Sequence, residues 1–294
     1  MNSSNQAPIK RDNLIAMLLA YTTCVQVSSF IFWLVFLLQN YSALLLKQRN
    51  KRFHPESVAE TEKQKYTMAH YEKGMKDVPG EDIHAYNTNY SAHREGIAPE
   101  EMVEIYNKWG ENYEKDFAGR YNGPVIAATS LAEHFEKGRR DAYVLDVAAG
   151  TGMVGEQLHH RGFTAIDGLD PSKTLLNIAE RKNIYGRLIN SFITSEPTAS
   201  IEEDTYDAIV ISGGMGEGHI KCSALNEMIR IVKKGGLICI VMREEYLDYV
   251  EEYKNLEPYM KQLEIEGKWE KMERKVVPNY SFQKNGIVFT YKVL

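Results

Sequence analysis

Two carboxylates and a glycine-rich turn are the residues of this chain best suited to chemistry. Asp146 lies within a short apolar run, and Gly150 and Gly152 follow it before a helical pattern begins. A lone carboxylate in an apolar strand is costly unless a cationic or hydrogen-bonding group meets it. A second acid, Asp170, ends the next apolar run about 20 residues after the glycines, where an acid can bind the ribose of a nucleoside. A strand, a glycine turn and a helix in this order place a nucleotide-like ligand against bare backbone, so the stretch predicts a cofactor site.

The glycine spacing alone leaves two cofactor classes open. Gly150, Gly152 and Gly155 also match the pattern of NAD-binding turns. A carboxylate just before the first glycine would repel a pyrophosphate, but it could receive the ammonium of a methionine moiety. The sequence therefore favours S-adenosylmethionine, and a tight turn without a ligand is the structural alternative. The candidate contacts in the turn are Asp146, Ala148, Gly150, Gly152 and Met153.

Apolar runs alternate with helical patterns from residue 144 onward, which is typical of an α/β protein with a doubly wound sheet. Five strands are expected, at 144–147, 164–170, 188–192, 206–212 and 237–242. Two more, at 269–277 and 287–293, are expected to form an antiparallel hairpin around a loop at 279–286. Helices are expected at 124–137, 154–160, 172–183, 222–232 and 244–263.

An aromatic stripe marks a helix expected at 99–117. Met102, Tyr106, Trp109, Tyr113 and Phe117 recur at helical spacing along one face. Such a stripe packs against a core, or it forms a lid over a ligand. Under the lid interpretation, Trp109 and Tyr113 contact the cofactor.

Several segments carry a resemblance to a known family. Asp146-Val-Ala-Ala-Gly-Thr-Gly152 resembles motif I of the seven-strand S-adenosylmethionine-dependent methyltransferases. More narrowly, the chain resembles the Williams–Beuren-syndrome-region methyltransferase-like family from about residue 90 to the C-terminus. The resemblance implies a Rossmann-like seven-strand sheet with the C-terminal hairpin, S-adenosylmethionine as cofactor, and the lid. The supporting segments are 93–100, 106–116, 121–124, 162–172 and 206–219.

Methyl transfer requires mainly that acceptor and methyl group meet in a dry site. The expected acceptor site is the loop after the fourth strand, 213–219, where small residues allow close approach. Ser212, just before this loop, is a candidate cofactor contact. Glu217 and His219 could orient the acceptor or take its proton, or they could simply be solvated. Many relatives carry an acid after the third strand that faces adenine; this chain has none, and Phe192 could flank the ring instead.

Composition limits the remaining function classes. A net charge of -5 with interspersed acids and bases gives no indication of a nucleic-acid-binding surface. Three scattered cysteines do not support a disulfide framework or a zinc site. At 294 residues, the chain can hold one large domain with extensions.

The N-terminal segment predicts a membrane contact. No charged residue occurs between positions 13 and 46, and 14–38 is long enough to span a bilayer. Basic residues at 47–52 favour a single-pass anchor with a cytosolic domain. The alternatives are a signal peptide, a helix that lies on the membrane surface, or a non-native extension. If the mature protein lacks this segment, we expect it to be cytoplasmic. The expected layout is 1–52 with the anchor, 53–97 as a polar tether with helix near 60–71, and 98–294 as the catalytic domain.

We therefore expect a membrane-attached, S-adenosylmethionine-dependent methyltransferase with a small-molecule or peptide acceptor. Two alternatives are a tethered cofactor-binding module without turnover and an NAD-dependent reductase. The Tyr-x-x-x-Lys pair of such reductases occurs at Tyr280 and Lys284, within the expected hairpin and not on a helix.

Overall fold

The computed structural model describes residues 78, 80–135 and 137–294. The candidate membrane segment at 14–38 and the helical pattern near 60–71 lie outside these residues. Within the described part of the chain, no helix has both the length and the apolar character needed to cross a bilayer.

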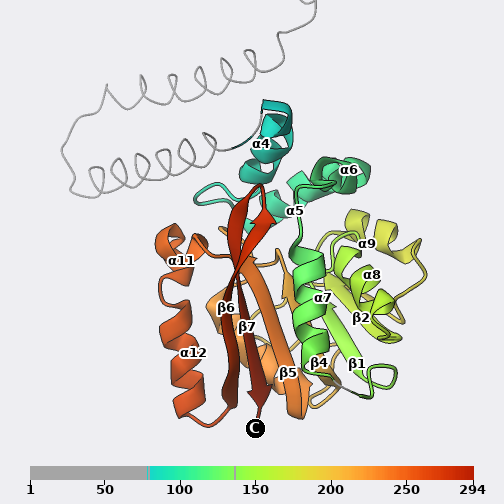
Figure 1. Cartoon of the computed structure of the whole chain (residues 1–294), viewed down its shortest axis with the longest axis vertical. Coiled ribbons are helices and arrows are strands. Elements are labelled where there is room, and N and C mark those ends of the chain that lie inside the picture. Colours follow the sequence, from blue (N-terminus) through green and yellow to red (C-terminus); the bar gives the residue numbers. More distant parts are fainter. Residues whose placement is uncertain (1–77, 79, 136) are drawn as a thin grey trace, which may run out of the picture. The chain divides into compact units, whose positions relative to one another are not determined.

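The sheet has seven strands in the order β3-β2-β1-β4-β5-β7-β6 (Figure 1). The first five strands are parallel, and β7 pairs antiparallel with both β5 and β6. The prediction of a Rossmann-like sheet with a C-terminal antiparallel hairpin is therefore confirmed. The strands are β1 Tyr143–Val147, β2 Ala165–Asp170, β3 Leu188–Asn190, β4 Tyr206–Ser212, β5 Val232–Arg243, β6 Trp269–Ser281 and β7 Lys284–Val293.

Helices cover both faces of the sheet, because alternate residues of the central strands point to opposite sides. Ile209 and Ile238 lie in one apolar cluster with residues of α12, whereas Val210 and Cys239 lie in another with residues of α7 and α8. Figure 1 shows α12 and α7 on opposite sides of the β6–β7 hairpin. The helices that flank the sheet are α7 Gly123–Glu133, α8 Met153–His160, α9 Lys173–Glu180, α10 Leu225–Ile231, α11 Tyr246–Tyr249 and α12 Leu256–Ile265.

Two long helices expected from the sequence are interrupted. The helix expected at 99–117 is α5 Pro99–Trp109 and α6 Tyr113–Phe117, joined by a 3-10 turn. Gly110 causes the break, since its φ of 41° and ψ of -118° lie outside the helical region. The helix expected at 244–263 divides into α11 and α12, because Val250 between them is extended with ψ 115°.

The hairpin loop is shorter than expected. Instead of a loop at 279–286, β6 continues to Ser281 and β7 begins at Lys284. Phe282 and Gln283 make the turn with φ values of 46° and 60°, the left-handed conformation of a two-residue hairpin turn.

Helix α4, Ile83–Ser91, occupies part of the stretch expected to be a polar tether. Ala85 and Tyr86 are buried, and the Tyr86 ring meets Phe282 edge-on at a centroid distance of 5.4 Å. Figure 1 shows α4, α5 and α6 near the tip of the β6–β7 hairpin. The described part of 53–97 therefore packs on the domain, a contact that the sequence analysis did not predict.

Candidate functional site

The glycine turn joins β1 to α8 in a tightly bent conformation. Ala148, Gly150 and Gly152 have φ values of 57°, 54° and 89°, which are all in the left-handed region. Glycine adopts this region at little cost, whereas Ala148 does not. Met153 is the first residue of α8 and is half-buried. The predicted turn residues thus lie together at the start of this helix.

Asp146 is fully buried below the turn. Its Oδ2 accepts hydrogen bonds from the Gly155 amide at 3.1 Å and the Tyr185 hydroxyl at 2.7 Å. Its Oδ1 has no hydrogen-bond partner among the described residues. Burial raises the pKa of the Asp146 carboxyl to about 7. A buried, partly unsatisfied acid of this kind is a place where a cationic ligand group would fit.

Asp170 meets the same turn from the end of β2. Its Oδ2 accepts from the Gly150 amide at 2.9 Å, and its Oδ1 accepts from the Ser172 amide at 2.7 Å. Burial raises the pKa of this carboxyl to about 6. The structure therefore brings Asp146 and Asp170 to one glycine turn, as the sequence predicts, and neither acid forms an ion pair with another described residue. The predicted contact of Asp170 with a ribose stays a prediction.

Asp167, in the same strand as Asp170, is a buried acid with a structural role. It is also buried, but it accepts from Arg187 Nε at 2.7 Å and from the hydroxyls of Tyr143 and Tyr206 at 2.6 and 2.9 Å. Because its charge is matched by a guanidinium, Asp167 needs no ligand. Asp146 and Asp170 differ from Asp167, because neither of them is paired with a guanidinium of a described residue.

The aromatic stripe packs into one apolar cluster, with its tyrosines at the edge of the cluster. Trp109 and Phe117 are buried in a cluster with residues of α4 and the hairpin, and the Trp109 indole donates to Asp116 at 2.8 Å. Tyr113 is half-buried, and the nearby charge of Asp170 adds to the burial that raises its pKa. The core interpretation therefore describes Trp109, whereas Tyr113 packs on Trp109 and Phe117 with centroid distances of 4.9 and 4.7 Å, and its lid role stays a prediction.

The loop after β4 packs against the glycine turn. A methyl group added to Gly214 would lie 2.7 Å from the Ala148 Cβ, so glycine permits this contact. Ser212 pairs with the Tyr121 hydroxyl at 2.8 Å. The Glu217 carboxylate accepts from the Gly96 amide at 3.2 Å, so it holds the chain that follows α4.

His219 has a defined environment in this loop. Its Nδ1 lies 2.7 Å from the Glu217 carbonyl, and its Nε2 lies 3.0 Å from the Tyr106 hydroxyl. Burial lowers the pKa of His219 to about 4. Phe192, in contrast, lies beyond the end of β3 with 41% of its side chain exposed, so the structure leaves its predicted contact with adenine open.

Four residues that sequence reasoning missed also line this region. Tyr185 contacts Asp146, Tyr121 contacts Ser212, and Tyr106 contacts His219. His93 stacks on His219 with a centroid distance of 4.3 Å. Tyr106 lies in the aromatic stripe, and His93 and Tyr121 lie in segments that carry the family resemblance, whereas Tyr185 comes from a segment without a recognisable motif.

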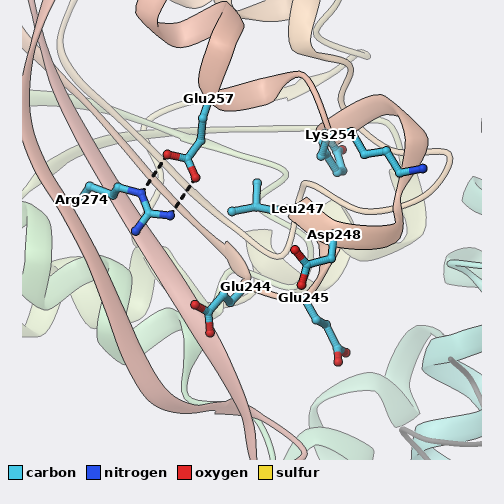
Figure 2. A pocket seen from close by; sticks show the side chains of 8 residues that line it. Glu244, Glu245, Leu247, Asp248, Lys254, Glu257 and Arg274 are labelled. Carbon is cyan, nitrogen blue, oxygen red and sulfur yellow. Dashed lines mark hydrogen bonds and ion pairs between the residues drawn. The ribbon is translucent and has the colours of Figure 1, made fainter.

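A pocket of about 350 Å³ lies elsewhere, between α11, α12 and β6 (Figure 2). It is lined mainly by acids, and Glu257 forms a bidentate ion pair with Arg274, with both N–O distances at 2.8 Å. None of the predicted site residues lines this pocket, so it is separate from the glycine turn.

Comparisons with known proteins find methyltransferases among the proteins similar to this chain. Residues 144–236 match the methyltransferase domain family. Human methyltransferase-like protein 27 is 34% identical over 173 residues, which are 58% of this chain and 69% of the human protein. A demethylmenaquinone methyltransferase of Renibacterium salmoninarum is 35% identical over 98 residues, 33% of this chain and 39% of that protein.

A solved structure confirms the fold alone. The [4+2]-cyclase SpnF superposes with a TM-score of 0.52 at 13% identity, over 68% of this chain and 98% of the cyclase. A fold of this kind hosts more than one reaction, so function must be argued from the site.

The site fits the cofactor of methyl transfer. The unsatisfied oxygen of Asp146 matches an ammonium, and the Asp170 carboxylate has acceptor capacity for hydroxyls. Family and site together indicate S-adenosylmethionine as the cofactor. The chain belongs to the methyltransferase family that includes human methyltransferase-like protein 27.

Proposed function

We propose that this chain catalyses methyl transfer from S-adenosylmethionine to a small-molecule or peptide acceptor. The observation that carries the proposal is the buried Asp146 carboxylate, which has one oxygen without a partner among the described residues and lies beside a left-handed glycine turn. A cationic ammonium would supply the missing partner, whereas a pyrophosphate would be repelled. When bound, the cofactor supplies an electrophilic methyl group.

The residues of the chain would bind and orient the two reactants. Asp146 would accept hydrogen bonds from the ammonium, and Asp170 would accept them from the ribose hydroxyls. Tyr113 and its neighbours in α5 and α6 would exclude water from the site. The loop after β4 would hold the acceptor, because it packs directly against the glycine turn through Gly214 and Ala148.

The reductase alternative has little support in the structure. Tyr280 and Lys284 lie in different strands on either side of the hairpin turn. The Tyr280 hydroxyl faces that of Tyr121 at 3.5 Å. A reductase would instead need the pair on one helix beside the cofactor.

Calorimetry tests the proposal directly. The full chain is titrated with S-adenosylmethionine, S-adenosylhomocysteine and NADH under the same conditions. We expect both adenosyl ligands to bind and NADH not to bind. Binding of NADH without either adenosyl ligand would overturn the proposal.

We also propose that the uncharged run at 13–46 attaches the protein to a membrane, with the methyltransferase domain on the cytosolic side. Its length and the basic residues at 47–52 support this proposal. The narrower membership of the Williams–Beuren-region family likewise stays a prediction.

A further inference from the structure

Two histidines from distant segments stack at the acceptor end of the site. His93 follows α4, and His219 lies in the loop after β4. Their rings are 4.3 Å apart and inclined by 19°. A side chain on Gly216 would come within 2.4 Å of the His93 ring, so glycine at this position makes room for the stack. Tyr246 of α11 lies on His93 as well, with a centroid distance of 5.9 Å.

The hydrogen bonds of the pair fix the tautomer of each ring. His93 Nδ1 lies 2.8 Å from the Asn89 carbonyl, and His219 Nδ1 lies 2.7 Å from the Glu217 carbonyl. A carbonyl oxygen can only accept, so each Nδ1 carries the proton and donates it. In the neutral ring, Nε2 therefore holds a free electron pair. In His219, this electron pair accepts the Tyr106 hydroxyl at 3.0 Å.

The surroundings keep both rings neutral. Burial is the main cause that lowers the pKa of His93, with smaller contributions from His219 and from the Arg243 guanidinium. Arg243 itself is buried in β5, where it donates to Ser281 at 2.7 Å and lies near Glu245. Two uncharged, proton-accepting nitrogens suit a neutral donor group better than an anion.

The contact between Tyr106 and His219 indicates which kind of hydrogen-bond donor a bound acceptor would carry. The phenolic hydroxyl of Tyr106 occupies the accepting nitrogen of His219, and the Tyr106 ring meets the His219 ring edge-on at 5.8 Å. Asn107, the next residue of α5, accepts from the Ser172 hydroxyl at 2.7 Å, and the Ser172 amide donates to Asp170, so this part of α5 lies beside the cofactor turn as well as the acceptor loop. A substrate hydroxyl in the position of the Tyr106 hydroxyl would lie next to the predicted cofactor site.

We propose that the His93–His219 pair binds the methyl acceptor through a phenol-type hydroxyl, which replaces the Tyr106 hydroxyl at Nε2 of His219, and that His93 is a positioning residue for this acceptor. The inference rests on the proposed methyl transfer. The acceptor oxygen forms the new bond to the methyl carbon, and the electron pair of the broken carbon–sulfur bond stays on sulfur. The hydroxyl proton passes to Nε2 of His219 and from there to solvent.

A weakly basic histidine is sufficient for this step. The hydroxyl proton becomes far more acidic as its oxygen acquires the methyl group, so a base whose pKa lies below neutrality can accept it. The stacked His93 ring restricts the orientation of the His219 ring.

The test measures the NMR resonances of the imidazole nitrogens and not turnover. Full chain labelled with ¹⁵N-histidine is saturated with S-adenosylhomocysteine and studied by NMR as wild type and as Tyr106→Phe. The substitution should shift the His219 Nε2 resonance, because its hydrogen bond is lost. Added 4-methylphenol should restore the shift, whereas p-xylene, which has the same shape without the hydroxyl, should not.

Two variants test the histidines themselves. His219→Asn should weaken 4-methylphenol binding about tenfold, the equivalent of one lost hydrogen bond, and His93→Phe should weaken it by a smaller factor, because it changes only the ring that orients His219; S-adenosylhomocysteine affinity should change less than about twofold in both variants. His159→Asn, at an exposed position of α8, is the matched control and should change neither affinity. Equal responses to 4-methylphenol and p-xylene, with normal S-adenosylhomocysteine binding, would overturn this inference alone. If the wild-type chain fails to bind S-adenosylhomocysteine, the proposed function falls and this inference falls with it.

Discussion

Binding of S-adenosylhomocysteine should release protons from the two acids at the glycine turn. In the ligand-free protein, burial raises the pKa of Asp146 to about 7 and that of Asp170 to about 6. An ammonium beside the first acid and hydroxyls that donate to the second favour the ionised carboxylates, so the ligand lowers both pKa values. Because the free protein then holds more protons than the complex, affinity must rise as the pH increases through this range.

The expected magnitude follows from these two pKa values. If both acids must be ionised in the complex, the apparent dissociation constant is about 22-fold above its high-pH limit at about pH 6 and about 1.4-fold above it at about pH 7.5. Binding should therefore be about 15-fold weaker at the lower pH, which corresponds to about 1.6 kcal/mol. Asp146 accounts for about eightfold of this effect and Asp170 for about twofold.

Calorimetry at the two pH values, in buffers of different ionisation enthalpy, measures both the affinity and the protons released. We expect between about one and two protons per ligand at about pH 6 and only a small fraction of one at about pH 7.5. Asp146→Asn keeps the shape of the side chain and its acceptor for Tyr185, so only about twofold pH dependence should remain in this variant.

The ligand-free variant provides an independent check. A buried acid whose pKa is raised by folding stabilises the protein only while it is protonated, and this stability is lost as the pH rises past about 7. Asp146→Asn should therefore not lower the melting temperature at about pH 8. A wild-type affinity that is the same at both pH values, without buffer-dependent enthalpy, would refute the contact between Asp146 and the ligand ammonium.

Four further predictions concern neighbouring features. Asp170→Ala should weaken S-adenosylhomocysteine binding about tenfold or more, since each charge-assisted hydrogen bond contributes about 1.5–3 kcal/mol; an unchanged dissociation constant with an intact circular dichroism spectrum would exclude it from the site. Asp167→Asn should destabilise the fold by about 1–2 kcal/mol in denaturant unfolding and leave ligand affinity unchanged, because it weakens the charge-assisted hydrogen bond with the half-exposed Arg187. Tyr113→Ala should weaken cofactor binding more than it lowers the melting temperature of the ligand-free protein, and an unfolded apoprotein would assign this tyrosine to the core. Full-length protein should resist carbonate extraction, whereas a chain that begins at Arg52 should be released; release of both would contradict the anchor.

The parallel part of the sheet could be predicted because its strands are buried on both faces. Such strands are continuous apolar runs with polar flanks, and β4 was predicted and found at Tyr206–Ser212. The glycine turn could also be predicted, because a backbone in the left-handed conformation favours glycine. Together these two signals placed Asp146 and Asp170 at one turn.

The two-residue turn of the hairpin could not be predicted, because the residues that form it are not the usual ones. Phe282 and Gln283 are large side chains in left-handed conformation, where a two-residue turn usually has asparagine or glycine. The sequence has such residues at Asn279 and at Asn285-Gly286, and these directed the prediction towards a longer loop. Packing of Phe282 between Tyr86 and Phe117 compensates for the unusual backbone.

The acceptor end of the site was hidden for a different reason. Helix α4 buries only Ala85, Tyr86 and Asn89, so its sequence has the polar composition of a tether. The methyltransferase domain match begins at residue 144, so it includes the glycine turn but neither His93 nor Tyr106. Proteins that share only the matched segment therefore share the elements predicted to bind the cofactor, without the contacts that we assign to the acceptor. This division is the physical reason why the acceptor of this chain must be sought through His93, Tyr106 and His219, and not through the substrates named for its relatives.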